Sequence, residues 1–295
     1  MRKLVAVFLV MLLASPAPAS AWGFEAHKFI MDRAIALLPA ELRPLFEAHR
    51  AVVVERSIDP DLWISAGYDD EESPNHFLDL DWEGYGPYPF AQLPRDFTTA
   101  VAKFGQERIE DNGKLPWRTE EIYGNLQRAF GAYARRGAFG RNEILHQSAW
   151  LAHYVSDGHV PFHAVLNYDG QLTGQNGIHA RFESTMFERF RGTLAIAPKP
   201  VAAVRNPRDF MFDTLIAGTR FVPAILKSDL TAIGAREVYD DEYYAAFVAA
   251  NRGVLEQRLN ESIAAVAAMI TGAWEAAGKP VLPLNPPSSP QRRRR

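Results

Sequence analysis

Two histidine–carboxylate pairs near the middle of the sequence have the spacing of metal ligands. His153 precedes Asp157 by four residues, and His179 precedes Glu183 by four. On a helix this spacing places two side chains on the same face, within reach of one ion. Imidazole nitrogen and carboxylate oxygen together suit a borderline divalent cation such as zinc. The pairs therefore predict a zinc site that holds more than one ion.

Other residues of the same chemical kind extend this set. His163 lies between the pairs, at the end of a His-x-Pro-x-His run that begins at His159. His27 lies near the start of the chain, and Asp61 and His76 are fifteen residues apart. The sequence has no cysteine, which excludes disulfides and thiolate ligands. Any metal must therefore be bound by His, Asp, Glu and backbone atoms.

The remaining histidines are left outside the ligand set. His49 has no carboxylate at ligand spacing. His146 lies seven residues before His153 on the same helical face, and we interpret it as a packing residue. His159 and Asp79 are interpreted as partners of the ligands rather than as ligands.

The chain begins with the features of a secretory signal peptide. A basic start is followed by an apolar run to Ala14, and Ala19-Ser20-Ala21 provides a small-x-small cleavage site. We predict a leader over residues 1–21, cleavage between Ala21 and Trp22, and a secreted or periplasmic protein. No later segment has about 18 uninterrupted apolar residues, so we predict no membrane span.

The elements that position the candidate ligands are predicted to be helical throughout. Apolar residues recur at three- and four-residue steps after Trp22, and no segment alternates with period two for long enough to predict a strand. The predicted helices cover residues 25–38, 95–112, 119–136, 142–158, 179–190, 208–233 with an interruption at Pro223, and 240–277. The predicted fold class is therefore all-α.

Two regions lack this helical pattern. Residues 59–94 are rich in Pro, Gly, Asp and aromatic residues, and we predict a long irregular loop region, with room for one short helix, that completes the metal site. The Pro-, Ser- and Arg-rich end predicts a disordered tail over residues 279–295. Residues 22–278 would then form a single compact multi-helix domain.

Net charge does not select a substrate class for this chain. The formal charge is −3 at pH 7, and loss of Arg2 and Lys3 with the leader would make it −5. A protein that binds nucleic acid non-specifically is usually basic. Carboxylates that bind metal inflate the acidic count, however, and each zinc ion restores two positive charges.

Taken together, the candidate residues are similar to those of a known superfamily. The chain resembles the superfamily shared by bacterial zinc-dependent phospholipase C and the fungal-type single-strand-specific nucleases. The similarity runs from Trp22 to about Phe190. It rests on Trp22 itself, the spacing of Asp61 and His76, the run His76-Phe-Leu-Asp79, the run His153-x3-Asp157-x5-His163, and the pair His179-x3-Glu183.

The resemblance implies three zinc ions and assigns ligands to each. One ion would take Asp61, His76, His153 and Asp157, and a second would take His163, His179 and Glu183. The third would take the α-amino nitrogen and carbonyl oxygen of Trp22, with His27 and a bridging Asp157. A free α-amine has a pKa near ~8 and loses its proton readily beside a dication. Cleavage before Trp22 would therefore complete the site.

The resemblance also implies the chemistry of the site. A hydroxide held between two zinc ions attacks the phosphorus of a phosphodiester, and the ions stabilise the charge that develops on the oxygens. Asp61 is the candidate catalytic residue, which orients or deprotonates the nucleophile. The implied activity is that of a secreted zinc-dependent phosphoric diester hydrolase.

Residues that match the phospholipase branch favour a lipid substrate. Glu183 as the last carboxylate resembles that branch, and Glu25 matches a residue that binds the lipid head group. Leu62 and Ser73, in contrast, depart from the choline pocket of the phospholipases. A preference for phosphatidylcholine is therefore not implied.

Other residues match the nuclease branch. His27 would be the sixth residue of the cleaved chain, as in the nucleases. Phe77 and Asp79 match a base-stacking ring and a base-bonding acid, although the His-Phe-x-Asp pattern occurs in both branches. Core packing is an equally good explanation of Phe77.

We therefore expect hydrolysis of a phospholipid at its head-group phosphodiester. The alternative is a nuclease acting on single-stranded DNA or RNA, and a third possibility is a zinc-binding protein without turnover. A structural zinc ion usually has four protein ligands. The candidate ligands are too few to give three ions four protein ligands each, so positions remain for water, which favours an enzyme. No protein partner is implied.

Overall fold

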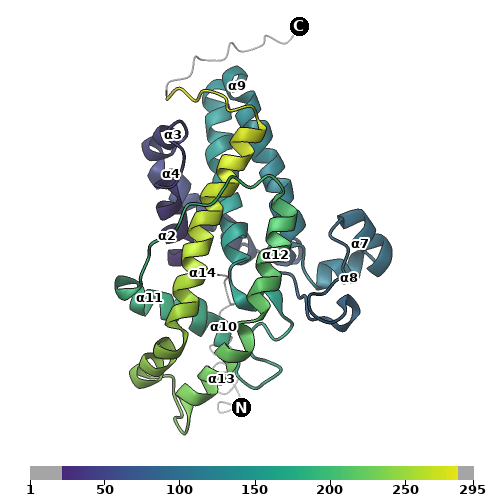
Figure 1. Cartoon of the computed structure of the whole chain (residues 1–295), viewed down its shortest axis with the longest axis vertical. Helices are drawn as coiled ribbons and strands as arrows, with labels where there is room; N and C mark the ends of the chain where they lie inside the picture. Colours follow the sequence, from purple (N-terminus) through teal and green to yellow (C-terminus); the bar gives the residue numbers. More distant parts are fainter. Residues whose placement is uncertain (1–21, 285–295) are drawn as a thin grey trace, which may run out of the picture.

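The computed structural model describes residues 22–284, with the side chains of residues 134–138 left out. All regular structure in this range is helical, and residues 22–284 contain no strand. The helices pack around one continuous apolar core (Figure 1). The predicted all-α class and the predicted single compact multi-helix domain are confirmed.

Short helices make up the first part of the chain. They are α2 (Phe24–Ile35), α3 (Arg43–Ala48), α4 (Arg50–Glu55), α5 (Asp59–Ser65), α6 (Asp69–Glu72), α7 (Phe97–Phe104) and α8 (Gln106–Asp111). The second part contains α9 (Leu115–Asp157), α10 (Ile178–Ala180), α11 (Met186–Phe190), α12 (Pro207–Thr219), α13 (Val222–Ile233) and α14 (Asp241–Ala276). The predicted interruption near Pro223 corresponds to the break between α12 and α13.

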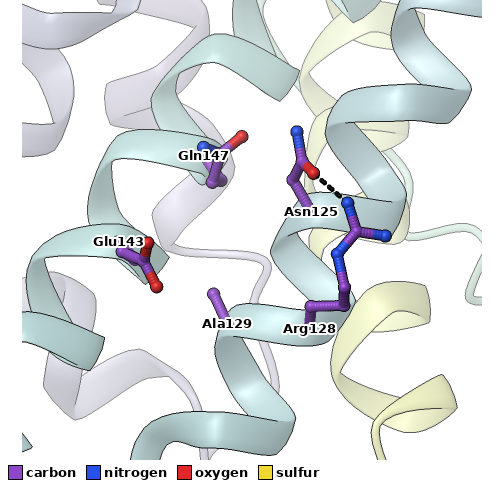
Figure 2. A pocket seen from close by; sticks show the side chains of 5 residues that line it. All are labelled: Asn125, Arg128, Ala129, Glu143 and Gln147. Carbon is purple, nitrogen blue, oxygen red and sulfur yellow. Dashed lines mark hydrogen bonds between the residues drawn. The ribbon is translucent and has the colours of Figure 1, made fainter. Parts of the chain in front are cut away.

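The helical segment α9 doubles back on itself. Arg118 Nε lies 3.3 Å from the hydroxyl of Tyr154, although a straight helix would separate residues 36 positions apart by about 54 Å. Asn125 and Gln147 likewise face each other across a small cavity (Figure 2). In both pairs the midpoint of the sequence between the two residues is position 136, next to Gly137. The two arms of α9 therefore correspond to the two helices predicted over 119–136 and 142–158.

Helix α14 packs along α9 and α2 and supplies much of the core. Its first turn is capped by the side chain of Asp240, which accepts a hydrogen bond of 2.8 Å from the backbone N–H of Tyr243. Apolar residues at three- and four-residue steps along this helix are buried, at Leu255, Leu259, Ile263, Val266, Ile270 and Trp274. These side chains form part of the apolar core.

The region predicted to be irregular is partly helical. Residues 59–75 form α5, α6 and a 3-10 turn over Ser73–Asn75, and a second 3-10 turn covers Glu83–Tyr85. The predicted loop region with one short helix therefore contains more helix than expected, and the additional helix lies in its first half. Pro60 occupies the first turn of α5, where a missing N–H costs no hydrogen bond, and Asp59 and Asp61 suit that end of the helix dipole.

Two other boundaries differ from the sequence prediction. The helix predicted over 95–112 is broken into α7 and α8 at Gly105, which has a φ of +87°. The start of the predicted tail packs on the domain, because Leu282 is buried and Pro283 O accepts a 2.6 Å hydrogen bond from the Tyr133 hydroxyl. The rest of the predicted tail and the predicted leader lie outside the described residues.

Every helix within residues 22–284 is too short or too polar to span a lipid bilayer. This finding agrees with the prediction that the chain has no membrane span.

Candidate metal centre

The predicted side-chain ligands come from segments far apart in the sequence and meet in the interior. They are His27 on α2, Asp61 on α5, His76 after the turn at Ser73–Asn75, His153 and Asp157 at the end of α9, His163 in the turn Pro161–Ala164, His179 on α10, and Glu183 in the π-helical turn Arg181–Thr185. None is more than 6% exposed. The fold therefore brings together all the predicted side-chain ligands.

A change of chain direction after α9 places His163 beside His76. The helix ends at Asp157, and Pro161 opens the 3-10 turn that carries His163. Leu78 N donates a 2.9 Å hydrogen bond to His163 O, and His163 Nδ1 lies 2.6 Å from His76 O. These two hydrogen bonds thus hold the histidines together.

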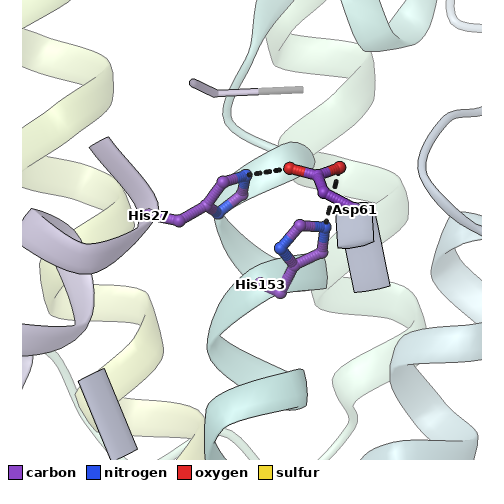
Figure 3. A group of neighbouring side chains, drawn as sticks. All are labelled: His27, Asp61 and His153. Atoms are coloured by element: carbon purple, nitrogen blue, oxygen red, sulfur yellow. Dashed lines mark ion pairs between the residues drawn. The ribbon is translucent and has the colours of Figure 1, made fainter. Parts of the chain in front are cut away.

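The first ligand group consists of His27, Asp61 and His153 (Figure 3). His27 Nε2 lies 3.9 Å from Asp61 Oδ2, and His153 Nε2 lies 3.7 Å from Asp61 Oδ1. A tetrahedral zinc with bonds of ~2.1 Å separates its ligand atoms by about 3.4 Å. The observed separations suit one shared ion.

The second group, His76, His153 and Asp157, shares His153 with the first. Asp157 Oδ2 lies 3.0 Å from His76 Nδ1 and 3.3 Å from His153 Nε2. Its other oxygen, Oδ1, lies 3.4 Å from His27 Nε2. The two oxygens of Asp157 therefore face different histidines, as a carboxylate that bridges two ions would.

The third group consists of His163, His179 and Glu183. His179 Nε2 lies 3.1 Å from Glu183 Oε2, and His163 Nε2 lies 3.8 Å from the same oxygen. Asp169 holds the preceding loop closed, because its carboxylate accepts hydrogen bonds from the N–H groups of Gly177 and His179. The four-residue pair predicted from the sequence is thus completed by His163.

Many of the candidate ligand atoms are buried without a hydrogen-bond partner among residues 22–284. They are His27 Nε2, both oxygens of Asp61, Asp157 Oδ1, His163 Nε2, both ring nitrogens of His179, and both oxygens of Glu183. Leaving one such group unpaired costs on the order of 1–3 kcal/mol, and more if it is charged. A divalent cation would satisfy several of them at once, so this donor set fits bound metal.

The second ring nitrogen of most of the histidines is held by the protein. His27 Nδ1 lies 3.0 Å from Ser156 Oγ, and His153 Nδ1 lies 2.8 Å from Ser57 O. His76 is turned the other way, with Nδ1 toward Asp157 and Nε2 3.4 Å from Glu72 Oε1. Such contacts orient imidazole ligands and set their tautomers.

Burial favours the neutral form of the candidate histidine ligands, and neighbouring carboxylates oppose this effect at His76. It lowers the pKa of His27, His153 and His163 well below the ordinary value, with nearby histidines adding to the effect. Burial also opposes the charge on His76, but hydrogen bonds to Asp157 and Glu72 outweigh it and raise its pKa to about 10. Neutral imidazoles are the form that binds metal.

The carboxylates show the opposite effect. Burial raises the pKa of Asp157 to about 7, although the neighbouring His76 lowers it. Burial likewise raises the pKa of Asp61 well above its ordinary value, and it raises the pKa of Glu183. The protein alone therefore disfavours the ionised forms that a metal would stabilise.

The ring of Trp22 is anchored beside the centre. Trp22 is fully buried, and its indole Nε1 donates a 2.7 Å hydrogen bond to Ser156 O. Gly23 lies so close to Ser184 that a Cβ on this glycine would be 2.7 Å from Ser184 Oγ. The start of the described chain thus contacts the residue before Asp157 and the residue after Glu183. The predicted cleavage before Trp22 involves residues outside the described range.

The predicted substrate-binding residues lie in different environments. Glu25 is exposed on α2 and pairs with Arg191 at 3.1 Å. Phe77 is half-buried, directly after His76. Asp79 is 6% exposed, and burial together with Asp81 raises its pKa to about 7. Phe77 and Asp79 thus follow His76 closely in the chain, whereas Glu25 lies on the surface.

Sequence reasoning missed the residues that hold the ligands. Glu72 contacts His76 and accepts a short hydrogen bond from the Tyr154 hydroxyl, and Ser57 and Ser156 hold His153 and His27. The four-residue spacing from Glu72 to His76 was a usable signal. The serine contacts join positions about a hundred residues apart, and no local pattern indicates them.

A separate cavity of about 240 Å³ lies between the arms of α9, and Figure 2 draws the side chains that line it. It is lined by Asn125, Arg128, Ala129, Glu143 and Gln147, none of which is a candidate ligand.

No family model matches the chain, and no curated protein matches it. The support for a metal centre therefore comes from the geometry of its residues and not from a matched relative.

Proposed function

We propose that this protein is a zinc-dependent phosphoric diester hydrolase of the phospholipase C type. The observation that carries the proposal is the cluster of buried, unpartnered His, Asp and Glu atoms within residues 22–284, at the separations of shared metal ligands. Zinc bound there would supply positive charge for phosphoryl oxygens and an acidic water molecule. The sequence resemblance to zinc-dependent phospholipases and nucleases supports the same assignment.

Asp61 is the proposed proton acceptor of the reaction. Both of its oxygens are buried and lack a hydrogen-bond partner in the described chain, and they point toward His27 and His153 (Figure 3). Hydrolysis forms one P–O bond to water and breaks the P–O bond to the leaving alcohol. In this proposal Asp61 orients the attacking water and holds its proton until the leaving oxygen takes one up.

Exposed apolar side chains beside the centre favour lipid as the substrate. Leu62 and Trp63 directly follow Asp61 on α5, and each is 41% exposed. Tyr168, 47% exposed, has its ring 6.4 Å from that of His179. Glu183, the last carboxylate among the candidate metal ligands, also resembles the phospholipase branch of the superfamily.

A single-strand-specific nuclease is the second candidate. Phe77 is half-buried next to His76, and Asp79 Oδ1 has no hydrogen-bond partner within the described chain. A ring and an acid so placed would suit stacking on a base and bonding to its edge. A zinc-binding protein without turnover is the third candidate.

One substrate panel distinguishes these candidates. Protein expressed with its own leader and loaded with zinc is given phosphatidylcholine, phosphatidylethanolamine, single-stranded DNA and RNA. Released phosphorylated head group supports the phospholipase, and nucleotide release without lipid turnover would replace it by the nuclease. Zinc binding with no turnover on any substrate would favour the third candidate. We also propose export from the cytoplasm, which N-terminal sequencing tests by showing whether the purified chain begins at Trp22.

A further inference from the structure

Ser156 lies one residue before Asp157 and is not one of the candidate ligands. Its side chain is buried at 1% exposure. Ser156 Oγ lies 2.5 Å from Ala152 O, 2.9 Å from His153 O and 3.0 Å from His27 Nδ1. The hydroxyl therefore contacts two backbone carbonyls and one imidazole nitrogen.

These contacts fix the position of the proton on His27. A serine hydroxyl has a single hydrogen, and a carbonyl oxygen can only accept. The hydrogen of Ser156 must point to the carbonyl of Ala152 or His153, so Oγ can only accept from the imidazole. His27 then carries its proton on Nδ1, and its Nε2 has a free lone pair.

That lone pair points into the metal centre. His27 Nε2 lies 3.4 Å from Asp157 Oδ1 and 3.9 Å from Asp61 Oδ2, and no group in residues 22–284 donates a hydrogen bond to it. The carbonyl of Ser156 accepts the indole N–H of Trp22 at 2.7 Å. One residue therefore holds both Trp22 and His27 against the helix that carries His153 and Asp157.

We propose that Ser156 is a positioning residue of the metal centre, which fixes the Nδ1–H tautomer of His27 and so presents Nε2 to a divalent cation. The proposal rests on the metal-binding part of the proposed function and does not depend on the substrate. Measurements of zinc binding without substrate therefore test it separately from the hydrolase assignment.

Ser156→Ala and Ser148→Ala form a matched pair for this test. Ser148 lies on the same arm of α9, is fully buried, and its Oγ has no partner among the described side chains and backbone. Zinc affinity is measured by competition with a chromophoric chelator, and the unfolding temperature checks the fold. Ser156→Ala should weaken one zinc site by about 10- to 100-fold, while Ser148→Ala stays within about twofold of the unmodified protein. Equal effects in the two variants, or none in Ser156→Ala, would overturn the proposal.

A double-mutant cycle tests whether Ser156 acts through His27. His27→Ala alone should weaken the same zinc site. Adding Ser156→Ala to it should cost less than about twofold more, because the hydroxyl then has no ligand to orient. A further tenfold loss in the double variant would show that Ser156 acts elsewhere, which contradicts the proposal.

The tautomer itself can be observed without a variant of Ser156. In histidine-labelled, zinc-loaded protein, NMR correlation of ring protons with ring nitrogens should show His27 protonated on Nδ1, with its signal identified by its absence in His27→Ala. A proton on Nε2 would refute the proposal whether or not Ser156→Ala folds. In Ser156→Ala, faster solvent exchange of the Nδ1 proton is expected.

Discussion

Asp157 is the residue on which the candidate metal centre depends most. Its two oxygens face His27 on one side and His76 and His153 on the other, at 3.0–3.4 Å. It is fully buried at the end of α9 and close enough to Glu183 for their charges to interact. A single substitution here should therefore affect more than one ion.

Replacing Asp157 by Asn should remove zinc and activity together. The amide keeps the shape of the carboxylate but loses its charge and one acceptor oxygen. We expect the zinc content, measured by elemental analysis, to fall by more than one ion, and hydrolysis to fall at least ~100-fold. Asp70→Asn, on the exposed surface of α6, is the control. Full zinc content in Asp157→Asn would rule out the bridging role.

Zinc affinity should rise with pH. His76, with a pKa of about 10, must lose a proton to bind metal, which makes affinity rise about tenfold per pH unit between 7 and 10. Below pH 7 Asp157 also holds a proton, because burial raises its pKa to about 7, so affinity should fall more steeply there. Competition titrations between pH 5.5 and 8.5 measure both slopes. A flat profile would contradict the assignment of these ligands.

Ionisation of the Asp79 carboxyl should lower the free energy of unfolding as pH rises. Burial and Asp81 raise its folded-state pKa to about 7, above the ordinary 3.8. The folded chain then holds a proton that the unfolded chain has lost, so stability decreases from pH 4 to pH 7. The variant Asp79→Asn cannot ionise at this position. Its free energy of unfolding, relative to that of the unmodified protein, should therefore be on the order of 2 kcal/mol higher at pH 8 than at pH 5. Urea unfolding at the two pH values measures this, and an equal effect at both would exclude the raised pKa.

At the scale of the elements, α9 and α14 form the frame of the centre. The second arm of α9 carries His153 and Asp157, and α14 packs against α9 and α2. Arg258 of α14 is buried and donates to the carbonyls of Gly158 and His159, just beyond the end of α9. The arginine satisfies carbonyls that the helix leaves unpaired and fixes the direction in which the chain leaves Asp157.

Two glycines of α14 should respond in opposite ways to alanine. A Cβ on Gly272 would lie 1.9 Å from Val204 O and 2.9 Å from the Tyr123 hydroxyl, whereas a Cβ on Gly253 would meet nothing within 4 Å. Gly272→Ala must push the 194–206 connector off the helix and should cost about 2 kcal/mol or more. Gly253→Ala should stabilise by about 0.5–1 kcal/mol. Chemical denaturation measures both, and a neutral Gly272→Ala would contradict this packing.

For the molecule as a whole, the metal centre concentrates charge at the place where the helices meet. Asp61, Asp157 and Glu183 are buried together, and no basic side chain other than histidine contacts them within residues 22–284. Unpaired buried carboxylates oppose folding, and bound cations would reverse that effect. Bound zinc is therefore expected to stabilise the fold.

Removing metal should lower the unfolding temperature. Each site contributes ~4 kcal/mol when free zinc is about 1,000 times its dissociation constant. Thermal unfolding in EDTA should therefore occur at lower temperature, and zinc or cobalt should restore it. Magnesium should not, because it prefers all-oxygen ligands. An unfolding temperature insensitive to chelation would argue against metal in this centre.

The local parts of this protein were predictable from the sequence. Helical periodicity gave the all-α class, and the four-residue steps from His153 to Asp157 and from His179 to Glu183 gave two ligand pairs, because a helix converts spacing directly into proximity. The break at Gly105 and the second helix of 59–75 were not predicted, since single glycines and prolines are compatible with more than one local structure.

Only the tertiary structure decided which segments meet. His27 contacts Ser156, His76 contacts His163, and His153 contacts Ser57, and each contact joins residues far apart in the sequence. Their proximity follows from how α2, α5 and the two arms of α9 pack, and packing depends on the shape of the whole core rather than on local spacing. The sequence determined the ligand types and two ligand pairs. The fold determined how the ligands divide into groups, which nitrogen each histidine presents, and which residue holds it there.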